Sequence, residues 1–172
     1  MTVAITSNTP IWSLAWIKQN PVRFSGVVLH LLLRTLFGIF WLAAAIHKIQ
    51  TDWLTTDVLQ RMFFVRLTEM PPDSFAVFYL QFFAIPLHKL VAWAIVCGEL
   101  YAAIGLLLGL TTRRAAVVSF FILANLAIGG YYDASLLPFF VLNIIFLCWP
   151  SGQWLGLDRW LSRKYPHTRG FR

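Results

Sequence analysis

The chain has 172 residues, of which 59% are hydrophobic, 16% aromatic and only 12% charged, with a formal net charge of +7. This composition excludes an ordinary water-soluble domain, and the length favours a single membrane domain over residues 1–172. The basic residues cluster beside apolar runs instead of interleaving with stacking aromatics, which argues against a nucleic-acid partner and favours the headgroups of a lipid bilayer.

The N-terminal segment, residues 1–25, is predicted to lie on the membrane surface. Within it, "PIWSLAWIKQ" (residues 10–19) places apolar residues at near-helical spacing, together with Trp12 and Trp16. Tryptophan is typical of the headgroup layer, and the stretch is too short to cross a bilayer. We therefore expect an interfacial helix that ends at Pro21.

The central part, residues 26–150, contains four apolar runs. A helix needs about 20 residues to cross the hydrocarbon layer. The predicted spans are residues 26–49, 87–110, 114–132 and 134–149. Asp133 is expected to cap the last of these, which tolerates Pro138 in its first turns. The predicted fold class is thus all-α, a four-transmembrane-helix bundle followed by a basic tail over residues 151–172.

The connection between the first two spans, residues 50–86, is long and amphipathic. Apolar and charged residues alternate with helical spacing over residues 53–65, and "EMPPD" then breaks the pattern. The following "SFAVFYLQFFAIP" is aromatic but too short to span comfortably. We expect this connection to form a cap in the membrane interface rather than a disordered linker.

The charged residues also predict an orientation. With four spans, one side of the membrane receives the basic clusters, and the other receives the acidic loop and Asp133. The positive-inside rule then places both termini in the cytoplasm of a bacterial-type inner membrane. The clusters on the predicted cytoplasmic side comprise Lys18, Arg23, Arg113, Arg114, Arg159, Arg163, Lys164, Arg169 and Arg172.

Two charged residues, Arg34 and Glu99, lie within the predicted spans. Counted from the cytoplasmic ends of their spans, Arg34 lies roughly 12 Å deep and Glu99 roughly 16 Å deep. This predicts an ion pair between them, with Asn125 and Asn143 at about the same depth. Such a polar layer either holds the bundle together or forms a ligand or proton site, and the sequence leaves both readings open.

The dipeptide His-Lys occurs twice, as His47-Lys48 and His88-Lys89, both at the predicted non-cytoplasmic surface. If the two pairs are neighbours, they form a site for an anion or a quinone carbonyl, with histidine able to transfer protons. The alternative is that the lysines extend to the interface from helix ends. His30 is expected to be a hydrogen-bonded helix histidine.

The two cysteines, Cys97 and Cys148, fall at different depths in predicted spans and are expected to be small buried residues. No Cys or His spacing typical of a metal site occurs in the sequence. We therefore predict no metal ligands.

Three stretches together resemble the DoxX/DoxD family over roughly residues 26–161. "LLRTLFGIFWLAAAIHKI" carries the Arg, Gly and Lys of its first motif at Arg34, Gly38 and Lys48. "CGELYAAIGLLLGLTTRRAA" is similar to the second motif, beginning at Glu99, and "GLDRWL" (residues 156–161) is similar to the tail of many members. Ala45 departs from the family pattern, which often has Gly shortly before the Lys.

The resemblance implies a four-helix membrane bundle but no single reaction. Some relatives are the membrane subunit of thiosulfate:quinone oxidoreductase, and others accompany redox or detoxification systems. One hypothesis is a quinone-linked redox subunit, with the quinone near the two His-Lys pairs and with Arg34 and Glu99 tuning charge or relaying protons. The other is a non-catalytic accessory subunit among the membrane protein subunits of a respiratory or photosynthetic complex. Whether the chain is an enzyme stays open.

Overall fold

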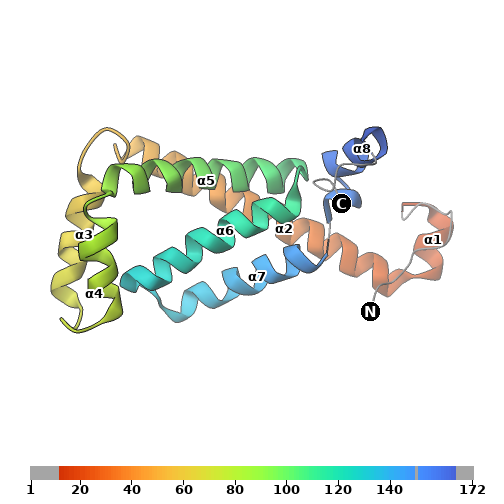
Figure 1. The fold of residues 1–172 in the computed structure, drawn as a ribbon. Helices are drawn as coiled ribbons and strands as arrows, with labels where there is room; N and C mark the ends of the chain where they lie inside the picture. Colours follow the sequence, from red (N-terminus) through yellow and green to blue (C-terminus); the bar gives the residue numbers. More distant parts are fainter. Residues whose placement is uncertain (1–11, 150, 166–172) are drawn as a thin grey trace.

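In a computed structural model, which describes residues 12–149 and 151–165, the chain folds into helices joined by turns. Helices α2, α5, α6 and α7 run alongside one another, while α3 and α4 lie across one end of this bundle (Figure 1). The short helices α1 and α8 lie at the opposite end. The all-helical prediction is therefore confirmed.

Helix α2 (Pro21–Gln50) is the longest element, with 30 residues. Pro21 begins this helix instead of ending the one before it, because a proline at the first helical position loses no hydrogen bond. Helix α1 (Leu14–Gln19) has only six residues. Residues 10 and 11 of the predicted interfacial helix lie outside the described residues. Trp12 donates a hydrogen bond from Nε1 to the Trp154 carbonyl, at 3.0 Å.

Among the described residues, three helical segments are long and apolar enough to cross a membrane. They are α2, α5 (His88–Leu108), and α6 (Thr112–Leu126) together with the π-helical turn η2 (Ala127–Tyr131) that continues it. These match the first three predicted spans to within a few residues, apart from the earlier start of α2.

Helix α7 (Leu137–Cys148) is shorter, with 12 residues, and follows the 3₁₀ turn η3 (Ala134–Leu136). Asp133 caps that turn as predicted, accepting a hydrogen bond from the Ser135 backbone N–H at 2.6 Å. Although α7 packs along α6, its length falls below that of a full crossing, so the count of four spans stays a prediction.

The long connection forms the expected cap. It contains α3 (Val58–Glu69), α4 (Phe75–Tyr79) and a π-helical turn, η1 (Leu80–Ala84). Arg66 on α3 donates from its guanidinium to the carbonyl of Gly130 at the end of η2, and it also pairs with Glu69 at 2.7 Å. These contacts tie the cap to the end of the third long helix.

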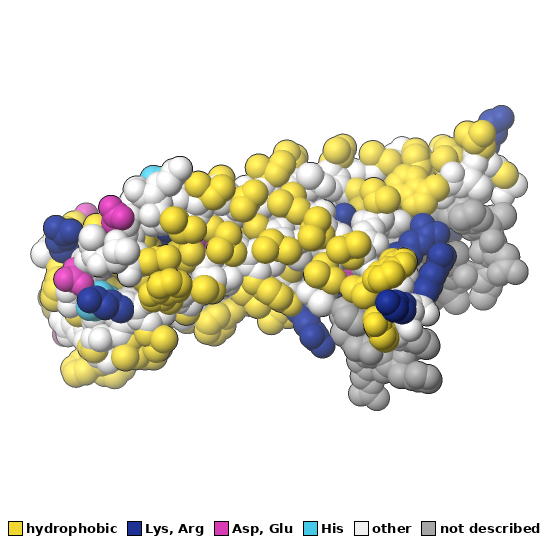
Figure 2. Space-filling view, turned by 90° about the horizontal axis from the view of Figure 1, so that it is seen from above, with side chains coloured by type: hydrophobic (Ala, Val, Ile, Leu, Met, Phe, Trp, Pro, Cys, Tyr) yellow, Lys and Arg dark blue, Asp and Glu magenta, His cyan; other side chains and the backbone are white. Residues whose placement is uncertain are grey.

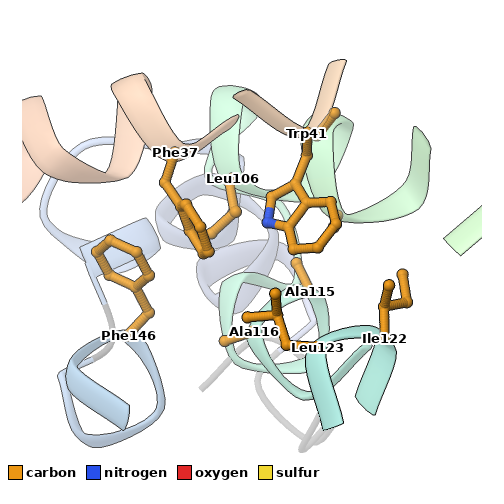
Figure 3. Close-up of a cluster of buried hydrophobic side chains, with 10 residues drawn as sticks. Phe37, Trp41, Leu106, Ala115, Ala116, Ile122, Leu123 and Phe146 are labelled. Atoms are coloured by element: carbon orange, nitrogen blue, oxygen red, sulfur yellow. The ribbon is translucent and has the colours of Figure 1, made fainter. Parts of the chain in front are cut away.

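The interior of the bundle is filled by aromatic and small residues (Figure 3). Small residues allow the helices to approach closely: a Cβ at Gly105 would come within 2.6 Å of the Ala115 Cβ, and one at Gly38 within 2.8 Å of Leu107 Cγ. Close packing of small residues is a main source of helix association in lipid. The contact between Gly38 and Leu107 also fixes the register of the antiparallel helices α2 and α5.

The surface divides into an apolar band and two charged ends (Figure 2). Acidic side chains gather at the end that carries α3 and α4, while lysines and arginines occur at both ends. The basic helix α8 (Leu157–Lys164) belongs to the other end, together with the 3₁₀ turn η4 (Ser151–Gln153). His167, Arg169 and Arg172 of the predicted tail lie outside the described residues.

Substitution of Gly105 by alanine tests the close packing of α5 on α6. The added methyl group overlaps Ala115 and the Leu110 carbonyl, so we expect a loss of about 1–3 kcal/mol in unfolding free energy. Thermal unfolding in detergent measures the loss. Gly26→Ala is the matched control, because a Cβ at Gly26 meets nothing within 4 Å, and equal melting temperatures for the two variants would contradict this packing.

Candidate functional site

Glu99 forms an ion pair with Lys48. The Lys48 ammonium donates to Glu99 Oε1 at 2.7 Å, and the two side chains are 17% and 3% exposed. Glu99 lies near the middle of α5, while Lys48 lies in the last turn of α2. The Lys48 nitrogen also lies 5.1 Å from the centre of the Trp53 ring, so this side chain connects the cap to the buried carboxylate.

The predicted pair between Arg34 and Glu99 is therefore wrong. Arg34 and Lys48 are separated by 14 positions on α2, which is about 21 Å along the helix axis. Since Gly38 faces Leu107, Arg34 falls level with the turn after α5, and Lys48 falls level with Glu99. The depth estimate failed because α2 begins before the apolar run and extends past the end of the bundle (Figure 1).

Arg34 is instead buried beneath the C-terminal segment. It is 3% exposed, and its Nη2 donates to the Leu155 carbonyl at 2.8 Å. Nearby, Gly109 ends α5 with a positive φ of 61°, and a Cβ there would come within 2.8 Å of Gly156 Cα and 3.0 Å of Arg34 Nη1. Glycine is required at position 109 both for its backbone conformation and for this close approach.

Asp158 fixes the same segment on the turn between α5 and α6. Its carboxylate accepts hydrogen bonds from the backbone N–H groups of Thr111 (2.6 Å) and Thr112 (3.1 Å) and from the Thr112 hydroxyl (3.1 Å). Its own N–H donates to the Gly109 carbonyl at 2.9 Å. Asp158 also attracts Arg34 electrostatically without forming a direct ion pair. We call this assembly of Arg34, Gly109, Thr112, Gly156 and Asp158 the C-terminal dock.

The other polar groups of the bundle do not join one layer, contrary to the prediction. Asn143 accepts from the Ser119 hydroxyl and donates to the Phe139 carbonyl at 2.9 Å. Asn125 accepts from the Tyr79 hydroxyl at 2.8 Å. Glu99, Arg34 and the two asparagines thus have four separate sets of partners, so no continuous polar belt forms.

The two His-Lys pairs also have separate partners. His88 contacts the Ile85 carbonyl at 2.9 Å and Asp57 at 3.1 Å, and Lys89 lies 3.7 Å from Asp57. The hydrogen bond from His88 and the charge of Lys89 hold the pKa of Asp57 below its usual value. Through residues 12–149 and 151–165, no hydrogen bond or ion pair links these residues to the exposed His47 or to Lys48.

Three smaller predictions change as well. His30 is buried, but its Nε2 makes no hydrogen bond with any described residue, and its ring meets Phe146 and Trp154 edge-on. Cys97 and Cys148 are exposed, not buried, because they face outward from the apolar band.

Asp158 was missed by the sequence analysis, although its position after the Gly-Leu of the tail motif could have suggested a docking segment.

Chemically, Lys48 and Glu99 offer a buried acid–base pair. Glu99 Oε2 has no hydrogen-bond partner among the described residues, so one oxygen of the carboxylate stays available to accept or deliver a proton. A charge inside an apolar bundle is costly unless it is paired, and intramembrane ionisable groups often mark proton pathways. The C-terminal dock attaches the C-terminal segment to the end of the bundle, and Arg34 Nε and Nη1 within it also have no hydrogen-bond partner among the described residues.

The ion pair can be tested by a double-mutant cycle. Lys48→Met leaves a buried carboxylate unpaired, and we expect a loss of roughly 3–5 kcal/mol in unfolding free energy. The double variant Lys48→Met/Glu99→Leu removes both charges and should be more stable than the single variant. Lys89→Met, at an exposed lysine, is the control. Glu99→Leu alone completes the cycle, and additive effects of Lys48→Met and Glu99→Leu would contradict the pairing.

The C-terminal dock predicts a large effect of Asp158→Ala. This substitution removes three accepted hydrogen bonds, and we expect a loss of about 2–4 kcal/mol. Limited proteolysis near residues 151–158, together with thermal unfolding, measures the detachment. Asp73→Ala, at an exposed aspartate of the cap, serves as the control. A proteolysis pattern of Asp158→Ala like that of the unsubstituted protein would show that the dock does not depend on this carboxylate.

Comparison with known proteins identifies the family. A model of the DoxX family matches residues 29–130, which include Arg34, Lys48 and Glu99 but not Asp158. No curated protein and no solved structure matches the chain. Because the family match covers more than half of the sequence and coincides with the apolar helices, the chain belongs to the DoxX family of membrane proteins.

Proposed function

We propose that this DoxX-family protein is the membrane subunit of a quinone-linked redox system, in which Lys48 and Glu99 exchange protons with the quinone. The observation that carries the proposal is the Lys48–Glu99 ion pair, buried between two helices that are each long enough to cross a membrane. Reduction of a quinone to a quinol takes up two electrons and two protons. A quinone within lipid therefore needs a protein group that delivers protons away from bulk water.

The position of the pair supports this role. Lys48 is partly exposed and contacts Trp53 at the cap end, while Glu99 is almost fully buried and has one oxygen without a partner. The pair thus extends from the cap into the apolar bundle. Arg34 belongs to the C-terminal dock, so we assign it a structural role and no part in proton transfer.

Electrons are proposed to come from a partner membrane protein. The resemblance to membrane subunits of thiosulfate:quinone oxidoreductase supports a multi-subunit assembly and makes thiosulfate the first donor to test. We also propose four crossings with both termini in the cytoplasm. This orientation is supported by the position of α1 and α8 at one end of the bundle (Figure 1) and by the basic residues there.

Glu99→Gln tests the proton role because it keeps the size of the side chain and removes its acidity. We expect thiosulfate-dependent reduction of decylubiquinone in native membranes to fall by roughly 100-fold, with loss of one limb of the pH profile. Quinone extracted from the purified variant should stay at the wild-type level. Glu69→Gln, at an exposed glutamate of the cap, is the control.

Two results would overturn the proposal. One is wild-type turnover in Glu99→Gln with only a lower protein yield, which would assign the ion pair to assembly. The other is the absence of any quinone from the wild-type protein purified in mild detergent.

A further inference from the structure

A partly open cavity of about 240 Å³ lies between the cap and the helices α5 and α6. Its walls come from α3, α4, η1, α5, α6 and η2, and they are almost entirely apolar. Both π-helical turns of the described chain, η1 and η2, contribute residues to it. Such turns are rare and occur frequently at functional sites.

The cavity is large enough for a substituted aromatic ring. A cavity of about 150 Å³ with aliphatic and aromatic walls can hold a benzene molecule. The wall here includes aromatic rings that can stack on or meet the edge of a planar ligand. These aromatic residues are Phe63, Tyr79, Phe83, Phe121 and Tyr131.

The mouth of the cavity opens toward the face that lipid would cover. Leu90 and Phe121, which line it, are 65% and 67% exposed although they belong to helices long enough to span a membrane. A ligand that enters here must come from the acyl chains, so it must be lipophilic, and a long isoprenoid tail can remain in the bilayer.

One polar pair interrupts the apolar wall. The Tyr79 hydroxyl donates to Asn125 Oδ1 at 2.8 Å, and Asn125 Nδ2 donates to the Phe121 carbonyl at 2.8 Å. Burial raises the pKa of Tyr79, which keeps its hydroxyl protonated. An amide nitrogen carries two hydrogens, so one N–H of Asn125 remains to donate to a ligand, and the Tyr79 oxygen can still accept.

From these features we propose that the cavity binds the ring of a membrane quinone, with Asn125 donating to a quinone carbonyl. The Tyr79 oxygen can accept from the hydroxyl of the reduced ring, so both redox forms find a partner. A lipid acyl chain would fit the apolar wall but offers no acceptor to Asn125. This inference rests on the proposed function, since it names where the quinone binds.

The location also relates the cavity to the ion pair. Ile95 lines the cavity and lies four positions before Glu99 on α5, about 6 Å along the helix axis. Residues four apart lie on neighbouring parts of one helix surface. The quinone ring would thus bind one helical turn from the buried carboxylate.

Binding of decylubiquinone to the full chain in lipid nanodiscs tests the inference. Ala94→Phe fills the cavity, and we expect affinity to fall at least tenfold, whereas Ala43→Phe, on an exposed part of α2, should bind like the wild type. Asn125→Ala keeps the space and removes the donor, so we expect roughly 3- to 10-fold weaker binding. Decylbenzene has the same tail but no carbonyl, so it should bind to the wild type more weakly than the quinone does. It should bind to Asn125→Ala with the same affinity as to the wild type.

The outcomes separate the two proposals. If the wild type binds decylubiquinone and both Ala94→Phe and Asn125→Ala bind it equally well, the cavity assignment is wrong while the proposed function stands. Equal binding of decylbenzene and the quinone to the wild type would show a site for acyl chains only and would also overturn the inference. If the wild type binds no quinone, both fail. Loss of quinone binding in Asn125→Ala supports the cavity as the quinone site. Normal turnover in Glu99→Gln, found together with that loss, would show that Glu99 has no role in proton transfer.

Discussion

A buried guanidinium needs hydrogen-bond acceptors and a nearby negative charge. At one end of this protein, the fold is organised by the groups that supply them to Arg34. Its carbonyl partner, Leu155, and the nearby carboxylate of Asp158 come from the C-terminal segment, which also caps α6 through Thr111 and Thr112. Three distant parts of the chain therefore meet in the C-terminal dock. Removal of any one of these three parts leaves charged or backbone polar groups buried without partners. Such unpaired groups strongly lower the free energy of unfolding.

The opposite half of the bundle has a different charge arrangement. Lys48 and Glu99 join α2 to α5 directly, and Lys48 continues to the cap through Trp53. The C-terminal dock joins Arg34 and Asp158 to backbone groups of the C-terminal segment and of the turn before α6. Arg34 Nε and Nη1, like Glu99 Oε2, have no hydrogen-bond partner among the described residues. We assign structure to the first cluster because its hydrogen bonds attach the C-terminal segment, and we propose chemistry for the second because Ile95, one turn before Glu99 on α5, lines the apolar cavity. The apolar cavity lies on the same side of the molecule as the second cluster, next to the cap.

Much of the fold follows from the sequence, because long apolar runs and the prolines between them are compatible with few structures other than membrane helices and the turns that join them. The three long helices, the cap helices and the cap on η3 were all predictable in this way. The partner of Glu99 was not predictable, because the depth of each charged residue in the membrane was counted from the start of an apolar run. The true register depends on contacts such as Gly38 with Leu107, which no spacing rule contains. The cavity could not be predicted from the sequence either, since its wall joins residues from the cap and from two spans that are far apart in sequence.

The C-terminal dock also has a consequence for biosynthesis. Arg34 and its hydrogen-bond partner Leu155 are 121 residues apart, so the cation enters the membrane long before the ribosome has made its partner. Until then the first helix carries an uncompensated charge and the turn before α6 lacks its cap. Formation of the C-terminal dock would therefore be the closing step of folding at this end of the bundle.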